Sequence, residues 1–239
     1  MNTFAMTQHI LSVIVMAIFG IIIGFALIPS YLLFMGLTEL TNNYGDAVKV
    51  IGICVSLGIG YILWGITLVL ICGVLGGLFK VRKSEGRYPL RSLITIQWGI
   101  SMVSHRVAQL FLKQVVPSFF ANIYYRMMGA KIGKGVQLNS EFINDASMLT
   151  FGDRVVVGGG ATINGHLVES GEIVLAPVSI GDDVLIGGGS VVQPGCIIGD
   201  GAVIGSRAVL PKWTNVPPGE IWAGIPAKCI RLADGSKPK

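Results

Sequence analysis

The sequence predicts a membrane-anchored protein in which two transmembrane helices and an amphipathic helix precede a parallel β-helix. One observation behind this prediction is composition: 52% of the residues are hydrophobic, 13% are charged and the mean hydropathy is +0.69, far above a soluble domain. The other is a six-residue repeat in the C-terminal half. Its aliphatic positions are Ile180, Ile186, Val192, Ile198, Ile204 and Leu210.

Two apolar segments near the N-terminus predict the transmembrane helices. Residues 9–37 and residues 50–79 contain no Lys, Arg, Asp or Glu. Each segment exceeds the roughly 20 residues that cross the hydrocarbon core of a bilayer. A cleaved secretory signal is the alternative for the first segment, but no basic residue precedes it and the apolar run is about twice the usual length. We therefore expect residues 1–83 to form a two-span transmembrane anchor.

The basic residues predict the orientation of this anchor. The link between the two segments carries Glu39 and Asp46 against one Lys. The basic residues that follow the second segment are Lys80, Arg82, Lys83, Arg87 and Arg91. The positive-inside rule places them, the N-terminus and the C-terminal domain in the cytoplasm, with the anchor in the inner or plasma membrane. The net charge of +5 then faces the membrane surface, and we expect no nucleic-acid partner.

Residues 84–128 predict helices that link the anchor to the repeat. Apolar residues recur at helical spacing between Ile96 and Val115, with basic residues on another side of the helix. Pro117 should end this amphipathic helix, and a short second helix should follow over residues 119–128. Two placements stay open for the longer helix. It lies in the lipid headgroup layer, as Trp98 and the basic residues favour, or it packs against the base of the β-helix.

Residues 129–232 predict the β-helix, and residues 233–239 form a tail. In this fold each hexapeptide forms one flat face, three faces complete a coil, and the recurring aliphatic residue points inward. The repeat is interrupted twice. The count from Leu138 to Phe151 is 13, so one residue should bulge out. The count from Ile163 to Ile180 is 17, one short of a full coil, so a short loop carrying His166 should leave the coil there.

Two longer runs of sequence point to a family. They are VSIGDDVLIGGGSVVQPG at residues 178–195 and VPPGEIWAGIPAKCIR at residues 216–231. With them, residues 129–231 resemble the hexapeptide-repeat acyltransferases, which include galactoside, maltose and virginiamycin acetyltransferases. The resemblance implies a left-handed β-helix, a homotrimer and acyl transfer. The implied substrate is acetyl-CoA or another acyl thioester, and no metal is implied.

A narrower resemblance covers three shorter motifs, MGAKIG at residues 128–133, HLVE at 166–169 and WAGIPA at 222–227. They are similar to the C-terminal membrane domain of polylysine-type nonribosomal peptide synthetases, which carries three such units among six spans. One unit and two predicted spans per chain would match that arrangement in a homotrimer. This resemblance implies a carrier protein or peptide synthetase as a partner, and a carrier-bound aminoacyl thioester with amide-bond formation as the alternative chemistry.

Acyl transfer to a hydroxyl or an amine needs a base, donors for the oxyanion and a groove that aligns the substrates. An imidazole suits the base because its unperturbed pKa is about 6.5. His166 is the one histidine of the repeat region, and its place after a Gly-rich coil resembles the family's catalytic position. Glu169 can orient the imidazole or bind an amine acceptor. The residues that compete for the orienting role are Asn144, Asp145 and Asn164.

The resemblance also implies where the thioester binds. The corner formed by Gly188, Gly189 and Ser190 would line the pantetheine groove, and a backbone N–H of the Gly-rich corners would serve the oxyanion. Basic residues would approach the phosphates of the cofactor, and each has the alternative of being an ordinary solvated charge. They are Arg207, Lys212, Lys228 and Arg231.

Two other classes of function compete with the acyltransferase. A γ-class carbonic anhydrase shares the β-helix, but its zinc needs three histidines and the repeat region has one. A non-catalytic trimeric membrane scaffold needs only the fold, and the well-placed His166 argues against it. Within the acyltransferases, a sugar acceptor is disfavoured because Leu185 stands where sugar acetyltransferases often have Trp.

Overall fold

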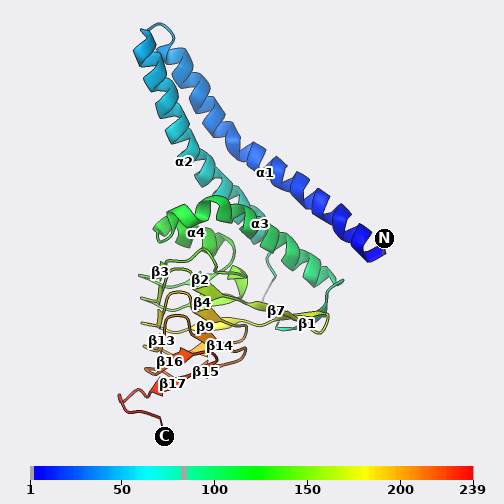
Figure 1. The fold of residues 1–239 in the computed structure, drawn as a ribbon, viewed down its shortest axis with the longest axis vertical. Helices are drawn as coiled ribbons and strands as arrows, with labels where there is room; N and C mark the ends of the chain where they lie inside the picture. The colour runs from blue at the N-terminus through cyan, green and yellow to red at the C-terminus, as the bar shows by residue number, and fades with distance from the viewer. Residues whose placement is uncertain (1–2, 82–84, 239) are drawn as a thin grey trace. The chain divides into compact units, whose positions relative to one another are not determined.

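The computed structural model describes residues 3–81 and 85–238 (Figure 1). Arg82 and Lys83 of the predicted basic segment therefore lie outside the described residues. The chain divides into two compact units, residues 1–72 with 106–111, and residues 73–105 with 112–239. The first unit is helical, and the second contains the repeat.

The first unit is built from two long apolar helices, as the composition predicts. They are α1 (Thr3–Thr41) and α2 (Asp46–Leu78), whose C-terminal end belongs to the second unit. Segments of 30 and 33 residues within them are long and apolar enough to cross a membrane by length and composition. The two helices meet where the Ser30 hydroxyl donates a hydrogen bond to the Gly60 carbonyl at 2.7 Å.

The second unit contains a parallel β-helix of short strands, which confirms the fold predicted from the repeat (Figure 1). The first face consists of β2 (Lys131–Ile132), β4 (Leu149–Phe151), β9 (Val178–Ile180), β12 (Ile197–Ile198) and β15 (Asn215–Val216). The second face consists of β3 (Gln137–Leu138), β5 (Val156–Val157), β10 (Leu185–Ile186), β13 (Val203–Ile204) and β16 (Ile221–Gly224), with β17 (Ala227–Arg231) returning antiparallel along β16. The third face consists of β6 (Thr162–Ile163), β11 (Val191–Val192) and β14 (Val209–Leu210).

The interior of the β-helix is filled by the recurring aliphatic residues. On the first face Phe151, Ile180 and Ile198 stand in register on successive strands, and all three are buried. The residue before each inward position points outward, because side chains alternate along a strand. Burial of one apolar side chain per face in every coil is the main contribution of the repeat to stability.

Side-chain carboxylates connect successive coils at the corner between the first two faces. The Asp153 carboxylate accepts the Lys134 N–H at 2.7 Å, and the Asp182 carboxylate accepts the Asp153 N–H at 2.7 Å. The Asp200 carboxylate accepts the Asp182 N–H at 2.8 Å. Gly152 is required here because a Cβ at its position would lie 2.3 Å from the Asp182 carboxylate. We call this series the aspartate ladder.

The two interruptions of the repeat have different structures. At the first, Ile143 still bridges Ile163 on the third face, and the short 3-10 helix η1 (Ala146–Met148) follows it. At the second, Ile163 on the third face is followed by Ile180 on the first face, since Ile180 pairs with Phe151. In the later coils the chain passes from the third face to the first within six residues. The second interruption is therefore an insertion between these two faces. The interval is therefore not a coil that lacks one residue, and the chain leaves the coil where the interruption of the repeat predicts.

This insertion is a β-hairpin and not the short loop that was predicted. It consists of β7 (His166–Glu169) and β8 (Glu172–Leu175), with β1 (Gly86–Pro89) as a third strand along β8. The Ala176 N–H donates to the Gly165 carbonyl at 2.9 Å and closes the base of the hairpin. Because Ala176 returns the chain to the corner that Gly165 left, the coils on either side keep their register.

The linking helices form where the sequence predicts them. They are α3 (Leu93–Val115) and α4 (Phe119–Met127), and the hydroxyls of Ser92 and Ser118 cap their N-termini. In the second unit the beginning of α3 packs on the β-helix side, where Ile94 and Trp98 contact a core cluster. That buried cluster consists of Val81, Met148, Ile173 and Leu175. Of the two placements left open, packing against the β-helix is the one observed for this part of α3.

Candidate active site

His166 and Asp145 form a hydrogen-bonded pair where the inserted hairpin leaves the coil. The imidazole Nδ1 lies 2.5 Å from Oδ2 of Asp145. His166 begins β7 with 21% of its side chain exposed, whereas the Asp145 side chain is only 2% exposed. Asp145 has a left-handed backbone conformation, with φ of 58°, immediately before η1. This turn directs its carboxylate at the imidazole.

The other contacts of Asp145 determine where the proton of this pair lies. Its Oδ2 also accepts the Gly165 N–H at 2.9 Å, and its Oδ1 accepts the Trp98 indole N–H at 2.8 Å. Both partners are donors that cannot accept a proton, so Asp145 acts as an ionised acceptor. His166 then carries its proton on Nδ1, and Nε2 keeps the lone pair that a base needs.

Trp98 is a part of this site that the sequence did not indicate. Its ring centroid lies 4.7 Å from that of His166, with the ring planes tilted by 58°. The sequence suggested a membrane-interface role for Trp98, since it is 47 residues from Asp145 and on a separate helix. A hydrogen-bonded indole in a linking helix has no motif that would reveal it.

Asn144 and Asn164 support the turns on either side of the pair. The Asn144 side-chain N–H donates to the Asn164 side-chain oxygen at 2.8 Å. Their backbone N–H groups donate to the carbonyls of Ile163 and Val192 in the β-helix. The two amides thereby fix the turn that carries Asp145 against the turn that leads into His166.

Glu169, at the far end of β7, takes part in a separate ionic cluster. It accepts from Lys212 Nζ at 2.6 and 2.8 Å and from the Arg87 guanidinium at 2.5 Å. The hydrogen bond from Lys212 is the main reason that the pKa of Glu169 lies below its ordinary value. Lys212, which was expected near the cofactor phosphates, is therefore paired with Glu169. Arg87, which was expected to face the membrane, is also engaged by the hairpin.

The predicted donor-binding residues lie at other edges of the β-helix than His166 does. Gly188 and Gly189 are in the turn between β10 and β11, and Arg207 in the next coil donates its N–H to the Gly188 carbonyl at 3.0 Å. Ser190 is fully buried inside the coil, so its side chain is not exposed at this corner. Lys228 is exposed on β17. This corner joins the second and third faces, whereas the His166 hairpin leaves between the third and first.

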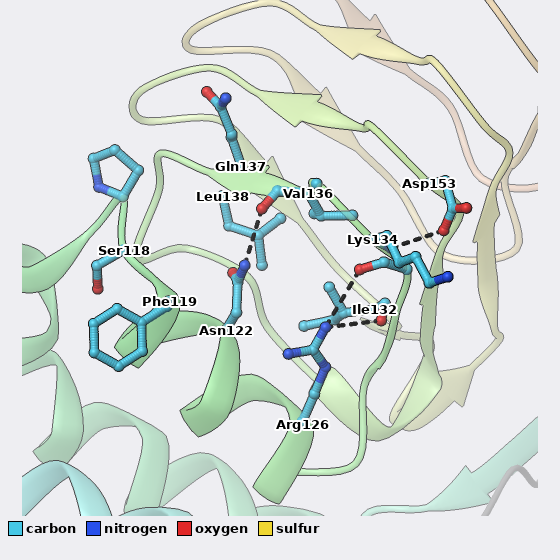
Figure 2. A pocket seen from close by; sticks show the side chains of 13 residues that line it. Ser118, Phe119, Asn122, Arg126, Ile132, Lys134, Val136, Gln137, Leu138 and Asp153 are labelled. Carbon is cyan, nitrogen blue, oxygen red and sulfur yellow. Dashed lines mark hydrogen bonds between the residues drawn. The ribbon is translucent and has the colours of Figure 1, made fainter.

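A cavity of about 850 Å³ lies between α4 and the first coil (Figure 2). Its polar groups mainly hold α4 to the coil: the Arg126 guanidinium donates to the Ile132 and Gly133 carbonyls at 3.0 and 3.3 Å, and the Asn122 amide donates to Val136 at 2.9 Å. Among the described residues, the cavity lining includes none of the predicted site residues. It is a separate concavity from the site of His166.

No cluster of three or more His, Cys, Asp or Glu side chains that could hold a metal occurs within residues 3–81 and 85–238.

Comparison with known proteins identifies the repeat. Residues 177–212 match the family described as bacterial transferase hexapeptide (six repeats). The resemblance to hexapeptide-repeat transferases is confirmed. Over 157 residues, 66% of this chain, the sequence is also 27% identical to a delta-poly-L-ornithine synthetase of Acinetobacter baumannii (strain AB307-0294). The chain spans only 12% of the length of that synthetase.

Solved structures with a similar fold include two sugar acetyltransferases. A maltose O-acetyltransferase from Clostridium difficile 630 is 22% identical, with 61% of this chain and 91% of that chain covered and a TM-score of 0.45. A galactoside acetyltransferase in complex with coenzyme A is 20% identical, with 62% and 87% covered and a TM-score of 0.46.

Proposed function

We propose that this protein is a membrane-anchored acyltransferase that moves an acyl group, most simply acetyl from acetyl-CoA, to a hydroxyl or an amine. The observation that carries the proposal is the buried Asp145 carboxylate, which holds Nδ1 of His166 at 2.5 Å and leaves Nε2 free for proton transfer. The hexapeptide-transferase match of residues 177–212 supports the same class of reaction.

The reaction follows from this geometry. Nε2 of His166 takes the proton of the acceptor as its oxygen or nitrogen attacks the thioester carbonyl carbon. The ionised Asp145 stabilises the imidazolium that forms, and backbone N–H groups of a Gly-rich corner receive the oxyanion. When the tetrahedral intermediate collapses, the C–S bond breaks and the imidazolium returns its proton to the thiolate. The acyl group is then attached to the acceptor through an ester or amide bond.

The proposed donor site is the corner of Gly188 and Gly189, with Arg207 and Lys228 near the phosphates. Within one chain this corner and His166 belong to different edges of the β-helix. A symmetric homotrimer, in which His166 of one subunit faces the donor corner of the next, would complete the site. The β-helix is left-handed in this proposal.

The apolar unit supports a membrane location. We assign α1 and α2 as two spans, with the β-helix in the cytoplasm, because basic residues such as Lys80 and Arg91 follow the second span. An anchor of this kind is useful when the acceptor, or the carrier that presents the thioester, is also confined to the membrane surface.

The similarity to the delta-poly-L-ornithine synthetase favours a second candidate, in which a carrier-bound aminoacyl thioester reacts with an amine to form an amide bond. The same His166 base serves both reactions. A comparison of acetyl-CoA with aminoacyl-carrier thioesters, each offered to amine and hydroxyl acceptors, separates the two candidates.

The decisive experiment removes the base. Full-length protein in lipid vesicles is assayed for thiol release from acetyl-CoA and from carrier-bound thioesters, with panels of amines and hydroxyl compounds. We expect His166→Ala to lower the rate about 10²- to 10⁴-fold, the usual contribution of a general base. His9→Ala, an exposed position of α1, is the matched control and should keep the wild-type rate. A His166→Ala rate above roughly one hundredth of wild type would exclude His166 as the base.

A further inference from the structure

We infer that Trp98 is a positioning residue of the proposed active site, acting through Asp145 to set the orientation and the basicity of His166. The inference rests on the proposed function and assigns to the linking helix α3 a part in the chemistry of the β-helix.

The hydrogen bond from Trp98 completes the set of donors around the buried Asp145 carboxylate. Asp145 receives three donors: the indole N–H on Oδ1 at 2.8 Å, and the His166 imidazole and the Gly165 N–H on Oδ2. Since the Asp145 side chain is 2% exposed, water has little access to replace the indole. Loss of the indole N–H would leave Oδ1 of an ionised carboxylate buried without that partner, which is costly.

The indole ring also restricts the imidazole. It packs against His166 at a centroid distance of 4.7 Å, while 21% of the His166 side chain stays exposed. The contact therefore limits rotation of the imidazole on one side and keeps part of the ring open to a substrate. One residue of α3 thus fixes both members of the pair, the carboxylate by a hydrogen bond and the imidazole by packing.

The position of Trp98 is determined by contacts outside the pair. Trp98 packs with Tyr88 and Ile94 against the buried cluster that includes Ile173 and Leu175 of β8. One residue before it, the Gln97 amide donates to the Lys80 carbonyl at 3.1 Å. The indole is therefore held in place before substrate binds, as a preorganised site requires.

Loss of the hydrogen bond from Trp98 should change how the pair responds to pH. A donor on Oδ1 disperses the negative charge of Asp145, and the carboxylate then holds the imidazolium less strongly. Removal of the donor makes Asp145 a stronger partner, so the imidazole keeps its second proton to higher pH. The fraction of His166 that is free to act as a base then falls at neutral pH.

Trp98→Phe tests this role, because it keeps an aromatic ring and removes the N–H. Trp222→Phe is the matched control, since the Trp222 indole also donates to a carboxylate, Glu220, at 2.7 Å on β16. In full-length protein we expect Trp98→Phe to lower kcat about tenfold, the scale of a hydrogen bond to a charged group, and to shift the acidic limb of the pH–rate profile to higher pH. The KM for the thioester should stay unchanged, and Trp222→Phe should behave as wild type.

A chemical readout makes the test independent of the acceptor. Diethyl pyrocarbonate acylates unprotonated imidazole, and mass spectrometry of the His166 peptide gives its rate of modification at each pH. The midpoint of this rate should shift to higher pH in Trp98→Phe and not in Trp222→Phe. A cooperative melting transition well above the assay temperature shows that each variant is folded. An unshifted midpoint would overturn the role of Trp98. Full activity in His166→Ala would instead overturn the proposed function, so the two failures are distinguishable.

Discussion

Neighbouring residues on one strand of the β-helix have opposite environments. On β10, Ile186 is fully buried and Leu185 is 43% exposed. We expect Ile186→Ala to lower the free energy of unfolding by about 2–5 kcal/mol, because it removes buried methylene groups and leaves a cavity. Leu185→Ala, on the same strand, should cost less than about 1 kcal/mol. Denaturant unfolding of the two variants in detergent measures both values, and equal losses would contradict the inward orientation of the repeat.

For individual residues, the sequence predicted the inward positions of the β-helix well and the candidate active site only in part. Inward positions are a local property, because the six-residue period assigns each side chain to a face. The partner of His166 is not local: Asp145 was one of several candidates, and its left-handed turn decided among them. Trp98 depends on packing between α3 and the β-helix, which no repeat or motif encodes.

Among the elements, the inserted hairpin should have a stability that depends on pH. Because the folded-state pKa of Glu169 is lowered, chiefly by the Lys212 hydrogen bond, this contact stabilises the protein above the ordinary value of 4.5 and is lost as pH falls toward the folded-state pKa. We expect the hydrogen-exchange protection factors of residues 166–175, which compare each amide with its unfolded rate at the same pH, to fall below pH 4.5 in wild type. Glu169→Gln should exchange faster already at pH 7 and show a flatter pH dependence.

Glu172→Gln is the matched control for the hairpin, since Glu172 faces Arg87 at the longer distance of 3.8 Å. It should exchange like wild type at pH 7, because a long, exposed ion pair contributes little. Identical exchange in Glu169→Gln and wild type at all pH values would rule out a stabilising role for the Lys212 contact.

The same hairpin shows where counting hexapeptides fails. The interval from Ile163 to Ile180 is close to the length of one coil, so the count alone cannot distinguish a coil that lacks a residue from a hairpin inserted between two faces. The pairing of β9 with β4 decides this, because it places Ile163 and Ile180 on consecutive faces. Strand register is a long-range property, and the sequence therefore predicted the place of the interruption but not its structure.

For the whole molecule, the separation of His166 from the donor corner makes assembly testable. We expect full-length protein in mild detergent to have three times the 25.4 kDa mass of one chain, by light scattering with the detergent contribution subtracted. The physical reason is that each chain presents two half-sites on different edges of its β-helix. His166→Ala is the control and should have the same mass, because a single side chain is a small part of the proposed interface between subunits. A monomer would contradict the shared site.

The aspartate ladder has a mechanical consequence. One coil, such as that from Ile180 to Ile198, corresponds to about 60 Å of fully extended chain. Its corner carboxylate, Asp182, accepts the backbone N–H of Asp153 from the coil before it. When a protease pulls the C-terminus, β17 should peel from β16 first. Unfolding of the coil that contains Asp200 then removes the acceptor of the Asp182 N–H. Unfolding of the coil that contains Asp182 in turn removes the acceptor of the Asp153 N–H. The β-helix should therefore unfold under force one coil at a time, because the loss of each coil removes a hydrogen bond from the coil before it.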